Sequence, residues 1–267
     1  MIKKLLPVAV LAALSVGSAH AASFLNGGFE DGTLSGWQEA GGLFQTPAII
    51  NPLDYVAGGS QVNNAFAVAG VTSAGTDPTL AAAGVTQQTV RYGDHSAIVN
   101  VSSPSAIAGS NNFSVTTLSQ KVSNYDGTSI NFSWAAVLQG AHGITEAANF
   151  GVTILDTKTN AVLYNVVSSA TAGAPNANLF TLSSNGWYYS GWQDVSINVA
   201  QGGDYEIILL ASDCDQGGHT GYAYLDGFGT VAGGPGDVGT GTVPEPGSLA
   251  LVGLGLAGLA ARRRKSA

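Results

Sequence analysis

The sequence predicts an all-β protein whose body is a single antiparallel β-sandwich, with one apolar segment at each end of the chain. Apolar and polar residues alternate with period two through much of residues 23–231, as they do in half-buried strands. Away from the two ends, no window keeps apolar residues at a helical spacing for three turns. Roughly 200 residues of short strands separated by turns are typical of a sandwich.

The clearest strand is expected at residues 130–138. There Ile130, Phe132 and Trp134 alternate with Asn131 and Ser133. Further β-rich runs, bounded by Gly, Asp and Asn, occupy residues 150–155, 195–199 and 205–210.

Turn and loop signals separate these runs. Tyr-Asp-Gly at residues 125–127 and Asp-Thr-Lys-Thr-Asn at residues 156–160 predict hairpin turns. Residues 41–88 are rich in Ala, Gly, Asn and Thr and alternate weakly, so we expect long loops between the early strands. Residues 232–243 contain many glycines and predict a flexible linker after a body that spans residues 22–231.

The composition excludes several classes of protein. The formal net charge is −8 over 267 residues, and residues 22–243 hold three basic against sixteen acidic side chains. Nucleic-acid binding needs Lys and Arg clustered on one face, so DNA and RNA are excluded as partners. Cys214 is the only cysteine, which excludes an internal disulfide and a zinc site with several thiolates.

The N-terminal segment, residues 1–21, has the three parts of a secretory signal peptide. Two lysines precede a short apolar stretch, which ends in the small residues Ala19 and Ala21. We therefore expect export through the Sec route and cleavage by signal peptidase before Ala22.

The C-terminal segment, residues 244–267, also has three parts. Pro244, Glu245 and Pro246 come first, and an apolar run over residues 247–261 follows. Arg262, Arg263, Arg264 and Lys265 then close the segment. The run is about 22 Å long as a helix, short against a hydrocarbon core of about 30 Å, so its length alone leaves a membrane span open. The basic cluster behind it favours a cytoplasmic tail, with the body outside.

This order of parts resembles the PEP-CTERM sorting signal of Gram-negative bacteria. The resemblance implies a single transmembrane helix and processing at the Pro-Glu-Pro motif by exosortase, a membrane cysteine transpeptidase. It also implies a transient stay in the inner membrane and a final place at the cell surface or in the extracellular matrix. Proteins with this signal usually accompany exopolysaccharide production, and hence biofilm.

The body resembles carbohydrate-binding modules with a jelly-roll fold. Residues 24–30 read Phe-Leu-Asn-Gly-Gly-Phe-Glu and are soon followed by Gly36-Trp37, which is similar to the opening strand of those domains. Residues 223–228, Ala-Tyr-Leu-Asp-Gly-Phe, are similar to their last strand, and residues 118–122 and 130–136 fit their central strands. In that family the first-strand Glu and the last-strand Asp often bind a structural calcium ion. The resemblance implies that Glu30 and Asp226 do so here, and solvated or hydrogen-bonded carboxylates are the alternative.

A dense polar cluster spans residues 213–219, with Asp213, Asp215 and His219 as metal-ligand types around Cys214. The segment resembles one that recurs in exported, adhesin-like bacterial sandwiches, where a second cysteine often follows the final strand. That region here holds Gly229 and Thr230. We expect a structural loop with a buried thiol, in preference to a metal site.

Catalytic motifs are missing from the sequence. It contains neither a Gly-x-Ser-x-Gly elbow nor a His-Glu-x-x-His pair. A glycosidase would use two facing carboxylates, but with so many acids a chance pair carries no information. We therefore expect no enzymatic activity.

Aromatic residues cluster at residues 187–192. In a strand, Trp187 and Tyr189 share one face while Tyr188 lies on the other, so some of these rings belong to the core. Together with Trp192, they offer flat faces on which a sugar ring can stack.

Three functions follow in order of preference. The first is an exported, non-catalytic surface or matrix protein that binds glycan. The second is a purely structural, acidic matrix or adhesin-like protein without a specific glycan ligand. The third is a secreted, glycoside-active enzyme.

Overall fold

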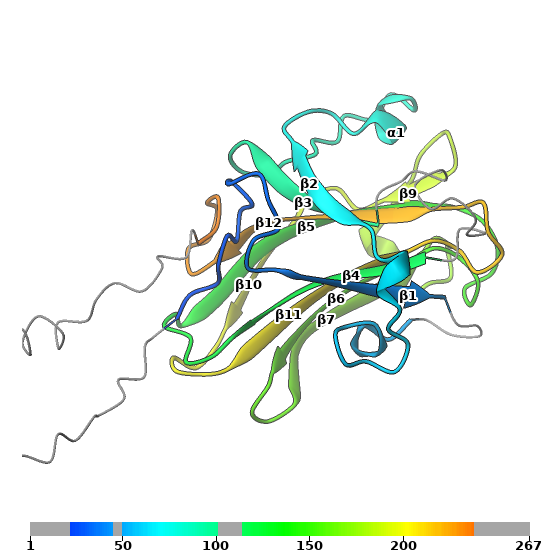
Figure 1. The fold of residues 1–267 in the computed structure, drawn as a ribbon. Helices are drawn as coiled ribbons and strands as arrows, with labels where there is room; N and C mark the ends of the chain where they lie inside the picture. Colours follow the sequence, from blue (N-terminus) through cyan, green and yellow to red (C-terminus); the bar gives the residue numbers. More distant parts are fainter. Residues whose placement is uncertain (1–21, 45–49, 101–113, 238–267) are drawn as a thin grey trace, which may run out of the picture.

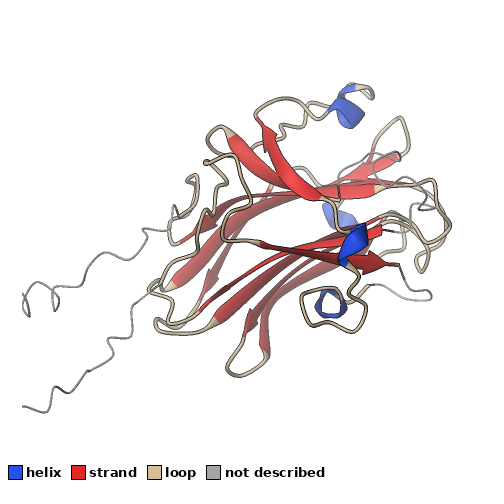
Figure 2. Ribbon diagram, in the orientation of Figure 1, coloured by secondary structure: helices blue, strands red, loops and turns tan. Residues whose placement is uncertain are grey.

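The computed structural model describes residues 22–44, 50–100 and 114–237, which form two antiparallel sheets stacked face to face (Figures 1 and 2). All pairings between the named strands are antiparallel, which confirms the predicted two-sheet sandwich. Among the described residues, no helix is both long and apolar enough to cross a membrane. The expected signal peptide and the expected C-terminal transmembrane helix lie outside the described residues.

One sheet has five strands in the order β1-β4-β11-β6-β7. Their bounds are β1 Gln38–Leu43, β4 Ser114–Val122, β11 Tyr205–Ser212, β6 Asn149–Asp156 and β7 Ala161–Ser169.

The other sheet has seven strands, in the order β2-β3-β12-β5-β9-β8, and β10 also pairs with β5. Their bounds are β2 Ala69–Ser73, β3 His95–Val99, β12 Gly221–Gly229, β5 Ser129–Gln139, β9 Trp187–Tyr189, β8 Thr181–Leu182 and β10 Gln193–Asn198. The short helices are η1 Pro52–Asp54, η2 Asn64–Phe66, α1 Pro78–Ala81 and η3 Ala177–Leu179.

The chain crosses repeatedly between the sheets. From β3 it passes to β4 in the five-stranded sheet, to β5 in the seven-stranded sheet, and back to β6 and β7. It returns through β8, β9 and β10, and then crosses to β11 and again to β12. The turn predicted at residues 156–160 joins β6 and β7, which pair as a hairpin. The hairpin predicted at residues 125–127 is wrong, because that turn joins β4 to β5 in the other sheet.

The core lies between the two sheets. It is filled by the apolar side chains that occupy every second position of the strands. On β5, Ile130, Phe132 and Trp134 face the five-stranded sheet, as the sequence predicts. Trp134 stacks on Phe150 of β6, with ring centroids 4.5 Å apart and an angle of 28° between the planes. Aromatic pairs of this kind stabilise a core beyond the apolar area that they bury.

The outer face of the seven-stranded sheet is covered as well. Side chains from the opposite faces of β5 and β12 form a second buried cluster, which consists of Leu80, Ala135, Val137, Tyr222 and Tyr224. Leu80 comes from α1, which lies on the outer side of this sheet in Figure 1. The segment of residues 74–94, which we call the covering segment, therefore packs across the outer face.

Asp77 fixes this segment to the sheet. Its fully buried carboxylate accepts hydrogen bonds from the hydroxyls of Tyr222 and Tyr224, at 2.7 and 2.8 Å. Its other oxygen caps α1 by accepting from the backbone N–H of Leu80 at 2.8 Å. Buried polar groups need such partners, so one carboxylate satisfies three donors.

Two expectations about the early chain were wrong. Residues 24–30 do not form an opening strand, because Asn26 and Phe29 adopt left-handed backbone conformations, with φ of 47° and 59°. Phe29 nevertheless reaches the core and is fully buried. Residues 41–88 also contain more than loops: β1 ends there, and β2 pairs with β3 along its whole length.

The chain stays attached to the body beyond its last strand. In the predicted linker, the backbone N–H of Asp237 donates to the Phe228 carbonyl at 3.0 Å, and the Asp237 carbonyl accepts from the N–H of Gly27 at 2.7 Å. Residues 232–237 thus join the first segment of the body to the last strand.

Replacing Asp77 tests how firmly the covering segment is held. Asp77→Ala leaves two buried hydroxyls without an acceptor and removes a helix cap, so we expect a loss of roughly 3–5 kcal/mol in the free energy of unfolding. Chemical denaturation measures this loss. The control is Asn63→Ala, which removes an exposed cap from η2 and should cost at most about 1 kcal/mol. Equal losses in the two variants would contradict the assignment.

Candidate functional site

The two carboxylates expected at the calcium site both accept hydrogen bonds from one short loop, residues 91–95. Asp226 Oδ2 accepts from the backbone N–H groups of Arg91 and Tyr92, both at 2.8 Å. Glu30 accepts from the N–H groups of Asp94 and His95, at 3.0 and 3.2 Å. The structure therefore brings the first segment and the last strand together around the backbone of this loop.

Asp226 on β12 is a fully buried acid that contacts the last residues of the covering segment. Its Oδ1 accepts from the N–H of Gly227, so among the described residues its hydrogen-bond donors are backbone groups. Burial raises the pKa of Asp226 to about 7, and the charge of Glu30 adds to this rise. A buried carboxylate beside a second acid favours the binding of a cation, which would offset both negative charges.

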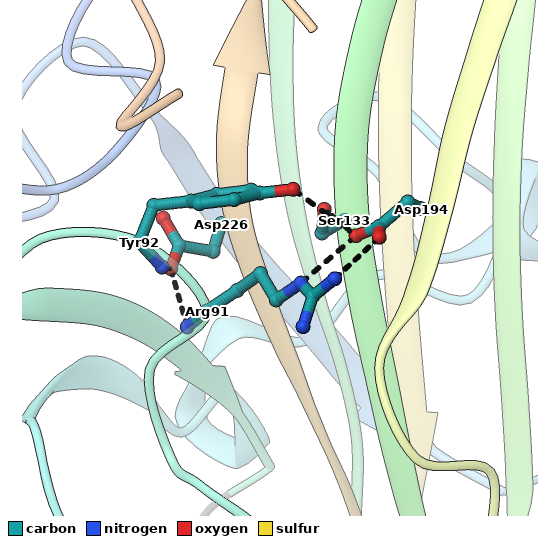
Figure 3. Close-up of polar contacts among 5 residues, drawn as sticks. All are labelled: Arg91, Tyr92, Ser133, Asp194 and Asp226. Atoms are coloured by element: carbon teal, nitrogen blue, oxygen red, sulfur yellow. Dashed lines mark hydrogen bonds and ion pairs between the residues drawn. The ribbon is translucent and has the colours of Figure 1, made fainter. Parts of the chain in front are cut away.

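The side chain of Arg91 is directed away from Asp226 and toward Asp194, as Figure 3 shows. The Arg91 guanidinium donates to both carboxylate oxygens of Asp194 on β10, with Nε–Oδ1 at 3.0 Å and Nη2–Oδ2 at 2.6 Å. Asp194 also accepts from the hydroxyl of Ser133 at 2.7 Å and, more weakly, from that of Tyr92 at 3.3 Å. Its hydrogen bonds with Arg91 lower the pKa of Asp194, so this carboxylate is held ionised.

Tyr92, Ser133 and Asp194 border a small cleft of about 110 Å³. It is lined by Tyr92, Asn131, Phe132, Ser133, Asp194, Val195, Ser196, Gly227, Ala232 and Gly233. Asp194, which lines it, is engaged by Arg91, and Asp226, which precedes the lining residue Gly227, is engaged by backbone N–H groups. The charges of the Arg91–Asp194 pair and the hydroxyls beside the cleft suit the recognition of a polar ligand.

The aromatic residues expected to bind glycan lie on the outer face of the same sheet. Trp187 and Tyr189 pack against the outer cluster and Tyr188 against the core, as the alternation predicted. Trp192 packs beside Tyr224, with ring centroids 6.1 Å apart.

These rings are half-buried. Trp187 lies 6.1 Å from Tyr222, measured between ring centroids, and the indole N–H of Trp192 donates to the Gln88 carbonyl of the covering segment at 2.9 Å. The rings therefore support the covering segment and still expose part of their surface to solvent.

The acidic loop at residues 213–219 begins with two buried residues, Asp213 and Cys214. Asp213 is buried and accepts from Asn100 at 3.0 Å and from Ser114 at 2.7 Å, so its carboxylate holds the loop to neighbouring strands. Burial raises the pKa of Asp213 to about 6. Cys214 is a buried, free thiol, as expected.

Two residues of this site were not predicted from the sequence, namely Arg91 and Asp194. They are 103 positions apart, and only the fold brings them together. The one available signal was that Arg91 is among only three basic residues in an acidic body.

The expected processing residues fall almost entirely outside the described chain. Pro244, Glu245, Pro246 and Arg262 to Arg264 lie there, as do Ala19 and Ala21. Ala22, the expected first residue of the mature protein, is described. Its N–H donates to the Asn124 carbonyl, and its own carbonyl accepts from Asp126, both at 3.0 Å.

The C-terminus matches the family model described as the PEP-CTERM protein-sorting motif, over residues 242–265. The chain therefore carries this motif, as its three parts predicted. The motif implies processing by exosortase, together with export and sorting to the cell surface. A comparison with curated protein sequences finds no match.

The body is similar to several solved structures. One is TmCBM61 in complex with β-1,4-galactotriose, at 14% identity and a TM-score of 0.38, covering 77% of this chain and 95% of that one. Another is Caldicellulosiruptor saccharolyticus CBM27-1 in complex with mannohexaose, at 12% identity and a TM-score of 0.37, covering 78% and 95%. A third is the K2 cleaved adhesin domain of Lys-gingipain, at 14% identity and a TM-score of 0.31, covering 72% and 97%. The likeness is confined to the general fold and brings no ligand with it.

Proposed function

We propose that this protein is an exported, non-catalytic component of the cell surface or extracellular matrix that accompanies exopolysaccharide in biofilm and binds glycan. The observation that carries the proposal is the PEP-CTERM motif at residues 242–265. The body adds an acidic sandwich whose described polar site is built from engaged carboxylates.

The sorting motif supplies the first test. Exosortase acts at Pro244–Pro246 while the apolar run holds the chain in the inner membrane, with the basic tail in the cytoplasm. We expect the intact mass of the exported protein to lack everything after Pro246. Replacing Arg262, Arg263, Arg264 and Lys265 by Ser should reduce processing and retention. Lys121→Ser, a basic replacement in the body, is the control and should be processed normally. An exported protein that keeps its basic tail would contradict this part.

Glycan binding is supported by the outer face of β9 and β10. Trp187, Tyr189 and Trp192 are partly exposed there, and flat aromatic faces suit the C–H edges of sugar rings. Asp194 lies on β10, two residues after Trp192, and its partner Arg91 lies on the covering segment. Both can form hydrogen bonds with the hydroxyl groups of a sugar. We place the glycan along this face.

A pull-down on the organism's own exopolysaccharide tests the assignment. Trp192→Ala should weaken retention by about tenfold, equivalent to ~1.4 kcal/mol, because a stacking ring is lost. The matched control is Leu182→Ala, which removes a side chain that is 56% exposed on β8 of the same sheet. Thermal melts identify variants that fail to fold.

A structural matrix protein is the second candidate function. Its supporting observation is that the same aromatic rings pack against Tyr222 and Tyr224, so support of the covering segment alone explains them. Under this function, native protein and Trp192→Ala would show the same low retention on the polysaccharide.

Calcium belongs to the proposal as a structural ion. Glu30 and Asp226 supply hard oxygen ligands beside one loop, and the buried, cation-poor environment of Asp226 fits a divalent ion. Bound there, calcium would neutralise both acids and join the first segment to the last strand.

Calcium should raise the melting temperature, because an ion bound only by the folded state stabilises that state. The stabilisation is about 2.7 kcal/mol when free calcium is in hundredfold excess over Kd. Asp226→Asn and Glu30→Gln should each abolish the rise, whereas Asp126→Asn, which changes an exposed carboxylate, should retain it. Identical melting curves of the native protein in EDTA and in millimolar calcium would exclude the ion.

A further inference from the structure

Three side chains of metal-ligand type converge in a group that contains none of the calcium or glycan residues. They are His142 from the loop between β5 and β6, and Cys214 and His219 from the loop between β11 and β12. One ligand atom from each lies within 4.8 Å of the other two. His142 was not singled out in the sequence, and neither Asp213 nor Asp215 belongs to this group.

The two loops are held together by backbone hydrogen bonds. The N–H of Asp215 donates to the Glu146 carbonyl at 3.0 Å, and the N–H of Gln139 donates to the Thr220 carbonyl at 2.8 Å. Within the second loop, the N–H of Cys214 donates to the His219 carbonyl at 2.9 Å. The backbones of the two loops that carry the ligands are therefore fixed relative to each other.

The separations fit a shared ion. His142 Nε2 lies 3.1 Å from His219 Nδ1, and Cys214 Sγ lies 3.7 Å from the same nitrogen. Around a tetrahedral zinc with ordinary bond lengths, two nitrogens lie about 3.3 Å apart, and a nitrogen and a sulfur about 3.6 Å. Two of the three separations thus already have the required size, and His142 is exposed, which leaves its side chain room to adjust.

We propose that His142, Cys214 and His219 bind one zinc ion. Imidazole nitrogens and a thiolate are the ligands that zinc prefers, whereas calcium and magnesium require oxygen. Because Cys214 is buried and His142 faces solvent, the ion enters from the His142 side and keeps its fourth position there for water. This site is independent of the calcium site and of the proposed glycan face, since it uses none of their residues.

Asp213 has a supporting place beside this site. Its carboxylate is occupied by Asn100 and Ser114, and its backbone N–H donates to the Ser114 carbonyl at 2.9 Å. Asp213 therefore holds the start of the loop and does not compete for the ion.

Isothermal titration of the full chain, freed of metal by a chelator, measures the site directly. We expect one zinc per chain in the presence of millimolar calcium. Cobalt bound in place of zinc should give a thiolate-to-metal charge-transfer band and the visible absorption of a tetrahedral complex, which together report the Cys214 ligand.

Matched variants identify the ligands. His142→Asn suits the left-handed backbone at this position, where φ is 63°, and removes an imidazole. Since even outer-shell partners are worth roughly 10–100-fold in metal affinity, we expect a loss of at least that size. Thr145→Ala, an exposed change in the same loop, should bind zinc like the native chain. Cys214→Ser should lose the charge-transfer band.

If Cys214→Ser fails to fold, the zinc affinity of His142→Asn and the cobalt spectrum of the native chain still test the two kinds of ligand. Zinc affinity that is unchanged by His142→Asn, or a cobalt complex without thiolate absorption, would overturn the proposal. Binding of copper without binding of zinc would also overturn it.

Discussion

The alternation of side chains along strand β12 is the constraint on which the rest of the molecule depends. Ala223 and Leu225 point into the core between the sheets, whereas Tyr222, Tyr224 and Asp226 point to the outer face. Because the side-chain period of a strand is two, a shift of one residue in its pairing with β5 would exchange these sets. Such a shift would move the Asp226 carboxylate from its backbone donors into the apolar core and Leu225 to the outer face, so the register of β12 is strongly specified.

The outer set determines what covers the sheet. Tyr222 and Tyr224 bind the carboxylate of Asp77, and Asp226 binds the backbone of Arg91 and Tyr92, so both ends of the covering segment are fixed by one strand. Buried acids are retained here because each is surrounded by donors. The polar groups that face solvent, including Arg91, owe their positions to this attachment.

The sequence predicted the regular part of this structure and not the irregular part. Residues 130–138 were recognisable as a strand because alternation is a local property, and the shared face of Trp187 and Tyr189 followed from the same rule. The course of residues 24–30 was missed because it depends on left-handed conformations at Asn26 and Phe29, which local pattern does not reveal.

Candidate site residues divide in the same way. Glu30 and Asp226 were named through a family resemblance, and the fold does bring them to one loop. The pairing of Arg91 with Asp194 and the approach of His142 to His219 join residues 103 and 77 positions apart. Long-range contacts of this kind arise from the crossing of strands between sheets, and a single sequence carries no local sign of them.

We propose that the outer face of the seven-stranded sheet, beside the covering segment, is the surface that contacts glycan. Hydrogen exchange of the folded protein with and without the organism's exopolysaccharide tests it most directly, because backbone amides report the site of contact without any substitution. The account predicts slower exchange across residues 187–194 and the covering segment, with the five-stranded sheet unchanged. Slower exchange confined to β1, β6 and β7, or no change anywhere, would contradict it.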